Sequence, residues 1–121
     1  MALQIRNREV NGISVVELDG RVVLGEETNK LREAVKNLIS QDQKKIVLDM
    51  KNVTMIDSSG LGALVAAYSS AKSAGAALRL SNLGAHFNQL LQLTKLLTVF
   101  EVSKTQEEAV NAFLKSQVSA V

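Results

Sequence analysis

The spacing of hydrophobic and polar residues predicts a β-hairpin at the start of the chain. Residues 3–10 and 13–18 alternate loosely between apolar and polar positions. Asn11-Gly12 separates the two runs, and this dipeptide between two such runs is a strong hairpin signal. Asp19-Gly20 then indicates another turn, followed by a short extended piece over residues 21–24.

Helical spacing begins at about residue 26. Apolar residues recur at intervals of three and four, as expected for one face of an amphipathic helix. They are Leu31, Ala34, Val35, Leu38 and Ile39. The acidic Glu26 and Glu27 precede this stripe, at the end of a helix where the dipole favours negative charge.

Short apolar runs and helical patterns alternate through the rest of the chain. Strands are predicted over residues 46–50 and 77–80, with a short edge strand near Val99. Residues 52–56 carry the chain on to Asp57 and have the apolar character of a strand end. Further helices are predicted after Asp57, from about Ala85, and after Thr105-Gln106-Glu107-Glu108, which matches a capping box. Alternating strands and helices imply βαβ units. The predicted fold class is therefore α/β: an N-terminal hairpin leads into a mostly parallel sheet of about four to five strands with about four helices.

Composition narrows the class of protein. The 121 residues suit one domain, predicted over 1–121 with a core at about 3–115. The chain has no cysteine, no signal-peptide pattern and no apolar run of about 20 residues, so we expect a cytoplasmic protein without disulfides or a membrane span. A net charge of +2 and an aromatic content of 3% argue against direct binding of nucleic acid.

The most informative segment is Asp57-Ser58-Ser59-Gly60-Leu61-Gly62. It follows an apolar strand and opens a helix, so it places a serine hydroxyl at the positive end of a helix dipole, where added negative charge is tolerated. Each glycine costs about 1 kcal/mol relative to alanine in a helix interior. No packing gain is evident from the sequence, and such broken local rules are expected at functional sites. The plain alternative is an ordinary N-cap, since Asp and Ser are preferred there.

Other chemistries lack their motifs. Ser58 and Ser59 do not lie in a G-x-S-x-G elbow, and neither phosphate-binding glycine pattern, G-x-x-x-x-G-K-[ST] or G-x-G-x-x-G, occurs. His86 is the single histidine and is expected to be an ordinary solvated side chain. We therefore predict no catalytic residue, no metal site and no cofactor.

Two segments together resemble the signature of STAS domains, in particular bacterial anti-sigma-factor antagonists. They are residues 46–49 and 55–62, and the resemblance extends over about residues 3–115. It implies a STAS-like single domain that binds an ATP-dependent serine-kinase anti-sigma factor and thereby releases a sigma factor. Phosphorylation of Ser58 by that kinase would release the antagonist, and a phosphatase would restore it. By the same resemblance, the residues that shape the docking surface are Asp57, Ser59, Gly60, Leu61 and Gly62.

The sequence leaves several alternatives open. Val23 stands where many antagonists carry an acidic residue, and Glu26 and Glu27 follow a few positions later. Ser59 could share the role of Ser58. STAS domains also serve as constant assembly parts, in stress-sensing complexes or as accessory subunits of lipid transporters. Whether the chain is a monomer or a homodimer is not determined by the sequence.

Overall fold

A five-stranded sheet organises the protein. The computed structural model describes residues 3–23, 25–95 and 100–119. Its elements in chain order are β1 (Gln4–Val10), β2 (Ile13–Val22), α1 (Glu26–Ser40), β3 (Lys45–Ile56), α2 (Ser58–Ser73), β4 (Ala77–Ser81), α3 (Ala85–Leu93), β5 (Glu101–Ser103) and α4 (Gln106–Ser119). The strands lie side by side in the order β1-β2-β3-β4-β5. β1 pairs antiparallel with β2, and the other neighbours pair parallel. The predicted α/β fold class is confirmed.

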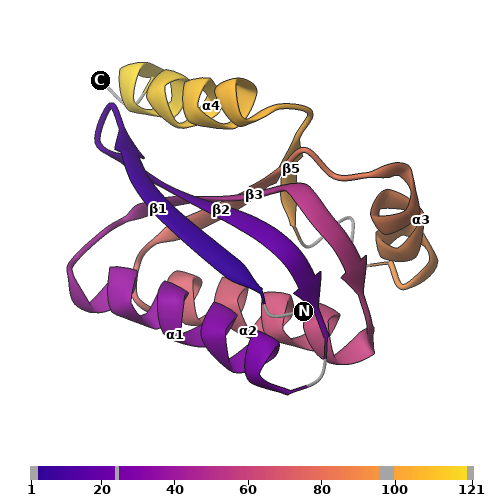
Figure 1. Ribbon diagram of the computed structural model, residues 1–121. Coiled ribbons are helices and arrows are strands. Elements are labelled where there is room, and N and C mark those ends of the chain that lie inside the picture. The colour runs from indigo at the N-terminus through magenta and orange to yellow at the C-terminus, as the bar shows by residue number, and fades with distance from the viewer. Residues whose placement is uncertain (1–2, 24, 96–99, 120–121) are drawn as a thin grey trace.

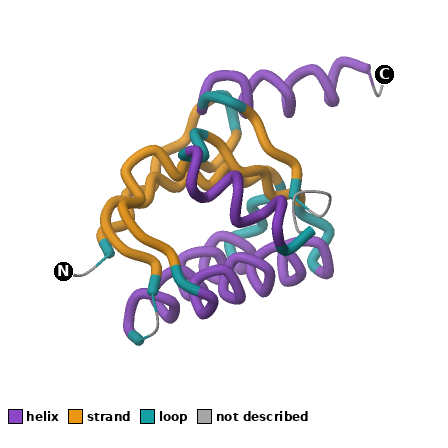
Figure 2. Tube along the Cα trace, turned by 90° about the vertical axis from the view of Figure 1, so that its right-hand side faces the viewer, coloured by secondary structure: helices purple, strands orange, loops and turns teal. Residues whose placement is uncertain are grey.

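Helices cover both faces of the sheet (Figure 1). Helices α1 and α2 lie next to each other on one face, and α4 crosses the other face. Figure 2 shows the same layers after a quarter turn, with the strands between α4 and the α1–α2 pair. The main core lies under α1 and α2, and a smaller apolar cluster lies under α4. The two cores are separated by the sheet, so residues that alternate along a strand belong to different cores.

Local sequence rules account for the hairpin turn and for the face of α1 that is buried. Asn11 and Gly12 both have positive φ, 53° and 81°, as a two-residue type I′ hairpin turn requires. The predicted stripe of α1 faces the main core: Leu31, Val35 and Leu38 are buried. The hairpin and the amphipathic helix are thus confirmed.

The turn predicted at Asp19-Gly20 is wrong. Strand β2 continues through both residues to Val22. Gly20 has φ of 118°, and the pairing of β2 with β3 shifts register on either side of it. The glycine therefore lies at an irregularity inside a long strand, where glycine often occurs. The strand predicted over residues 46–50 is longer than expected, because β3 continues without a break through residues 52–56 to Ile56.

The C-terminal part matches its prediction in outline. The edge strand predicted near Val99 falls in residues 96–99, outside the described residues, and the strand observed at this edge is β5. Half of the capping box forms, because Thr105 Oγ1 accepts a hydrogen bond from the N–H of Glu108 at 3.1 Å. The Glu108 carboxylate accepts from the N–H of Lys104. This cap fixes the start of α4 over the sheet.

Candidate functional site at the start of helix α2

The candidate site is the turn between β3 and α2. Asp57 is the N-cap of α2, with extended backbone angles, and its carboxylate accepts a hydrogen bond from the N–H of Gly60 at 2.8 Å. The Asp57 N–H in turn donates to the carbonyl oxygen of Val22 at 3.4 Å, which ties the turn to the end of β2. The capping interaction satisfies one of the N–H groups that a helix start leaves without an intrahelical acceptor.

Ser58 has the placement that the sequence predicts. It is the first residue of α2 and its side chain is exposed. The N-terminal ends of helices carry a partial positive charge from aligned peptide dipoles. The hydroxyl is therefore accessible to a modifying enzyme and lies where a phosphate would be tolerated, while its phosphorylation stays a prediction.

The two glycines have different surroundings. A Cβ built on Gly60 would lie 1.9 Å from the carbonyl oxygen of Val22 and 2.9 Å from a side-chain carbon of Ile56. The expectation that no packing gain explains this glycine is wrong, because only glycine lets α2 approach the end of β2 so closely. Gly62 is exposed, and a Cβ there would meet no heavy atom within 4 Å.

The other predicted docking residues divide by exposure. Ser59 and Asp57 are half-buried and reach the surface. Leu61 is 7% exposed and packs into the main core, and Gly60 is buried. Hence Asp57, Ser58, Ser59 and Gly62 can touch a partner directly, whereas Gly60 and Leu61 hold the turn in place.

The family-model comparison identifies this architecture. The model described as the STAS domain matches residues 4–109, most of the chain. The chain belongs to the STAS domain family.

Three solved structures share the fold over nearly their whole length. An anti-sigma factor antagonist from Mycobacterium paratuberculosis is 22% identical, with a TM-score of 0.79 over 92% of this chain and 93% of that one. The Bacillus cell fate determinant SpoIIAA in its phosphorylated form is 19% identical, with a TM-score of 0.69 over 93% and 99%. A sulfate transporter family protein from Wolinella succinogenes is 23% identical, with a TM-score of 0.76 over 91% and 90%. At these identities the likeness shows the fold alone.

The exposure of Met55 on this STAS domain was not predicted from the sequence. Met55 is 53% exposed, which is unusual for a large apolar side chain. It lies three residues before Ser58, and three residues span at most about 10 Å. The two register shifts between β2 and β3 disturb the simple alternation of faces along β3, so sequence spacing does not reveal that Met55 points outward.

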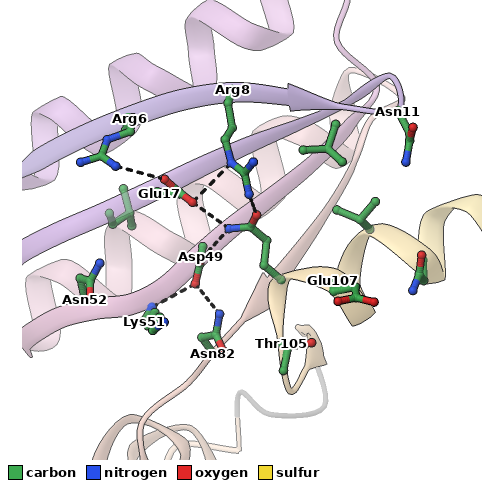
Figure 3. Close-up of a pocket in the computed structure, with 15 residues that line it drawn as sticks. Arg6, Arg8, Asn11, Glu17, Asp49, Lys51, Asn52, Asn82, Thr105 and Glu107 are labelled. Atoms are coloured by element: carbon green, nitrogen blue, oxygen red, sulfur yellow. Dashed lines mark hydrogen bonds and ion pairs between the residues drawn. The ribbon is translucent and has the colours of Figure 1, made fainter.

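A polar pocket lies on the face of the sheet that α4 covers, away from Ser58. It has a volume of about 660 Å³, and Glu17 and Asp49 point into it (Figure 3). These two carboxylates are register partners on the adjacent strands β2 and β3, and Asp49 is only 6% exposed. The sequence analysis assigned no role to them, because their proximity depends on the pairing register.

Gln106, the first residue of α4, connects this carboxylate pair. Its amide nitrogen donates to Asp49 Oδ2 at 2.6 Å and to Glu17 Oε2 at 3.0 Å, and its amide oxygen accepts from Arg8. Asn82 and the N–H of Lys51 donate to the other oxygen of Asp49. The carboxylates are therefore satisfied within the protein, and we interpret this network as the polar attachment of α4 to the sheet.

Replacing Gln106 with Ala is expected to lower the free energy of unfolding by about 1–3 kcal/mol, because Asp49 would lose a donor in a buried position. Urea denaturation of Gln106→Ala measures this loss. Asn111→Ala is the matched control, since Asn111 is an exposed amide residue on the same helix. An equal effect of the two substitutions would contradict the proposed attachment.

Neither a membrane-spanning helix nor a metal cluster is found in the part of the chain that the structure describes. None of its helices has the length and apolar character to cross a bilayer. The same residues hold no group of three or more His, Cys, Asp or Glu side chains arranged for a metal ion.

Proposed function

We propose that this STAS domain is a cytoplasmic anti-sigma-factor antagonist that works by exchange of partners. In its unmodified form it binds a serine-kinase anti-sigma factor through the surface around Ser58, and a sigma factor is released. The kinase transfers phosphate from ATP to Ser58, and the phosphorylated antagonist dissociates until a phosphatase restores the hydroxyl. The protein is a substrate in this cycle and not a catalyst.

The observation that carries the proposal is the exposed hydroxyl of Ser58 at the first position of α2. A phosphate there adds about −1.5 to −2 charges and three acceptor oxygens. The helix dipole makes negative charge at this end favourable by about 0.3–1 kcal/mol, so the fold tolerates the group. A partner packed closely on Ser58 and the open surface at Gly62 would meet a bulky dianion, and the complex would be disrupted.

The comparisons support this proposal over a general binding role, since antagonists occur among the similar solved structures and one of them was solved in a phosphorylated form. The likeness to a sulfate transporter family protein supports an alternative role. In that role the same fold would hold a partner permanently, as part of an assembly. A switch and a constant contact differ in whether Ser58 is modified.

Intact-mass spectrometry of protein isolated from its own cells tests the switch. We expect a form heavier by one phosphate in wild type, none in Ser58→Ala, and the form unchanged in Ser59→Ala. The adjacent serine is the matched control because it is the neighbouring hydroxyl in the same helical turn. Absence of the phosphorylated form from wild type under growth conditions in which the sigma factor stays bound to the anti-sigma factor would refute the switch.

A further inference from the structure

A second candidate contact surface lies between α1 and α2, on the layer of helices that covers the main core (Figure 1). A groove of about 450 Å³ separates the two helices there. Val35 and Ala67 are buried at its floor, Ile39 and Ala66 are half-buried, and the rim is exposed. The rim residues are Arg32, Lys36 and Ser70. The groove is thus apolar at its base and open to solvent.

The exposed surface of α2 is chemically unlike that of α1. Its exposed residues are Ser58, Gly62, Ser69, Ser70, Lys72 and Ser73, so no charged side chain and none larger than serine is exposed before Lys72. Helix α1 exposes several charged side chains on its surface, as soluble helices usually do. The α2 wall of the groove therefore presents little steric or solvation cost to a close neighbour.

The α1 wall supplies positive charge. Arg32 and Lys36 are one turn apart, and among the described residues neither forms an ion pair. The exposed acidic residues Glu26 and Glu33 line a different groove, between α1 and β1. The lining of the α1–α2 groove therefore carries two cations and no acidic side chain.

These features select one kind of occupant. Small side chains at Ala66 and Ser70 allow two helix backbones to approach closely, and an apolar groove between helices accepts the apolar face of an amphipathic helix. Unpaired cations at the rim favour carboxylates on that helix. A second copy of this chain would bring the same two cations to the contact and be repelled. We infer that the α1–α2 groove binds an acidic amphipathic helix of another protein.

This contact is separate from the proposed switch. Ala66 and Ser70 follow Ser58 by eight and twelve residues, which is about 12 and 18 Å along the helix axis. Screening at physiological salt reduces electrostatic effects beyond about 8 Å. Charge added at Ser58 should therefore leave the groove contact intact.

Photo-cross-linking in the full chain tests the inference. The photoreactive residue p-benzoylphenylalanine replaces exposed Ser73, three residues beyond Ser70 on α2 and outside the groove lining. The protein is irradiated in its own cells, and the cross-linked peptide is sequenced by mass spectrometry. We expect a peptide from another protein with acidic residues at helical spacing. The double substitution Arg32→Glu and Lys36→Glu should reduce the adduct at least tenfold, and Ser58→Glu should leave it unchanged.

The matched control is Lys51→Glu with Lys104→Glu, which makes the same charge change at exposed positions on the α4 side of the domain. It should retain the adduct. If the reversed pair unfolds, Arg32→Gln with Lys36→Gln replaces it, with a smaller loss expected. No adduct, an adduct with lipid or with a second copy, or an adduct insensitive to both pairs of substitutions would overturn the inference. None of these outcomes bears on phosphorylation of Ser58.

Discussion

Replacing Gly60 with Ala is expected to destabilise the domain by about 3 kcal/mol or to prevent folding. The added Cβ would lie 1.9 Å from the Val22 carbonyl oxygen, a backbone atom that cannot rotate away. Either α2 or the end of β2 must shift, and inserting atoms into such a packed site costs about 1–3 kcal/mol or more. Against a total stability of about 5–15 kcal/mol, this is a severe loss.

Gly62→Ala is the matched control for this prediction. It makes the same chemical change two residues later in the same helix, where a Cβ meets open space. Because alanine is better than glycine in a helix interior by about 1 kcal/mol, Gly62→Ala should stabilise the domain slightly. Urea denaturation of both variants measures the contrast. A cost for Gly60→Ala no greater than that for Gly62→Ala would show that α2 is not held in close contact with β2.

The contrast between these glycines shows what local sequence can and cannot predict. Both occur in one helical turn, and both break the same propensity rule. Only the contact between α2 and β2, two elements more than thirty residues apart in the chain, separates a packing requirement at Gly60 from an open surface at Gly62. The sequence therefore located the turn correctly but could not assign the reason for each glycine.

The parts of the fold that were predicted rest on local periodicity and turn chemistry. The Asn11-Gly12 turn and the α1 stripe need no knowledge of the rest of the molecule. The turn predicted at Asp19-Gly20 failed because pairing with β3 carries β2 through the glycine. Tertiary pairing here overrides a reliable local turn signal.

The position of the candidate site could be predicted from the sequence, but the polar network around Gln106 could not. Ser58 follows from a strand end, an N-cap residue and a helix start, all contiguous in the chain. Gln106, Glu17 and Asp49 come from three elements distant in sequence, and their contact depends on register and on which face α4 covers. The open surface of α2 could not be predicted from the sequence either, because it depends on how α1 packs beside it.

Ser58→Glu is expected to weaken binding of the kinase-type anti-sigma factor at least tenfold, which is the second large effect. The carboxylate imitates part of the phosphate charge at the helix start, and a desolvated carboxylate without a counter-charge is costly in an interface. The fold itself should tolerate it, with the free energy of unfolding within about 1 kcal/mol of wild type, because the dipole favours an acid at this end. Ser58→Glu would thus weaken binding while leaving the stability of the fold nearly unchanged, as a switch requires.

Isothermal titration calorimetry with the purified kinase measures this prediction, and Ser58→Ala is its matched control. Removing the hydroxyl leaves the surface neutral, so Ser58→Ala should bind as wild type does and resist release by ATP. Equal affinities of the Ala and Glu variants would mean that charge at residue 58 does not control the contact, and the constant assembly role would then be favoured. Unequal affinities with unchanged stability would place the effect at the interface, because the two variants differ only at one exposed position of α2.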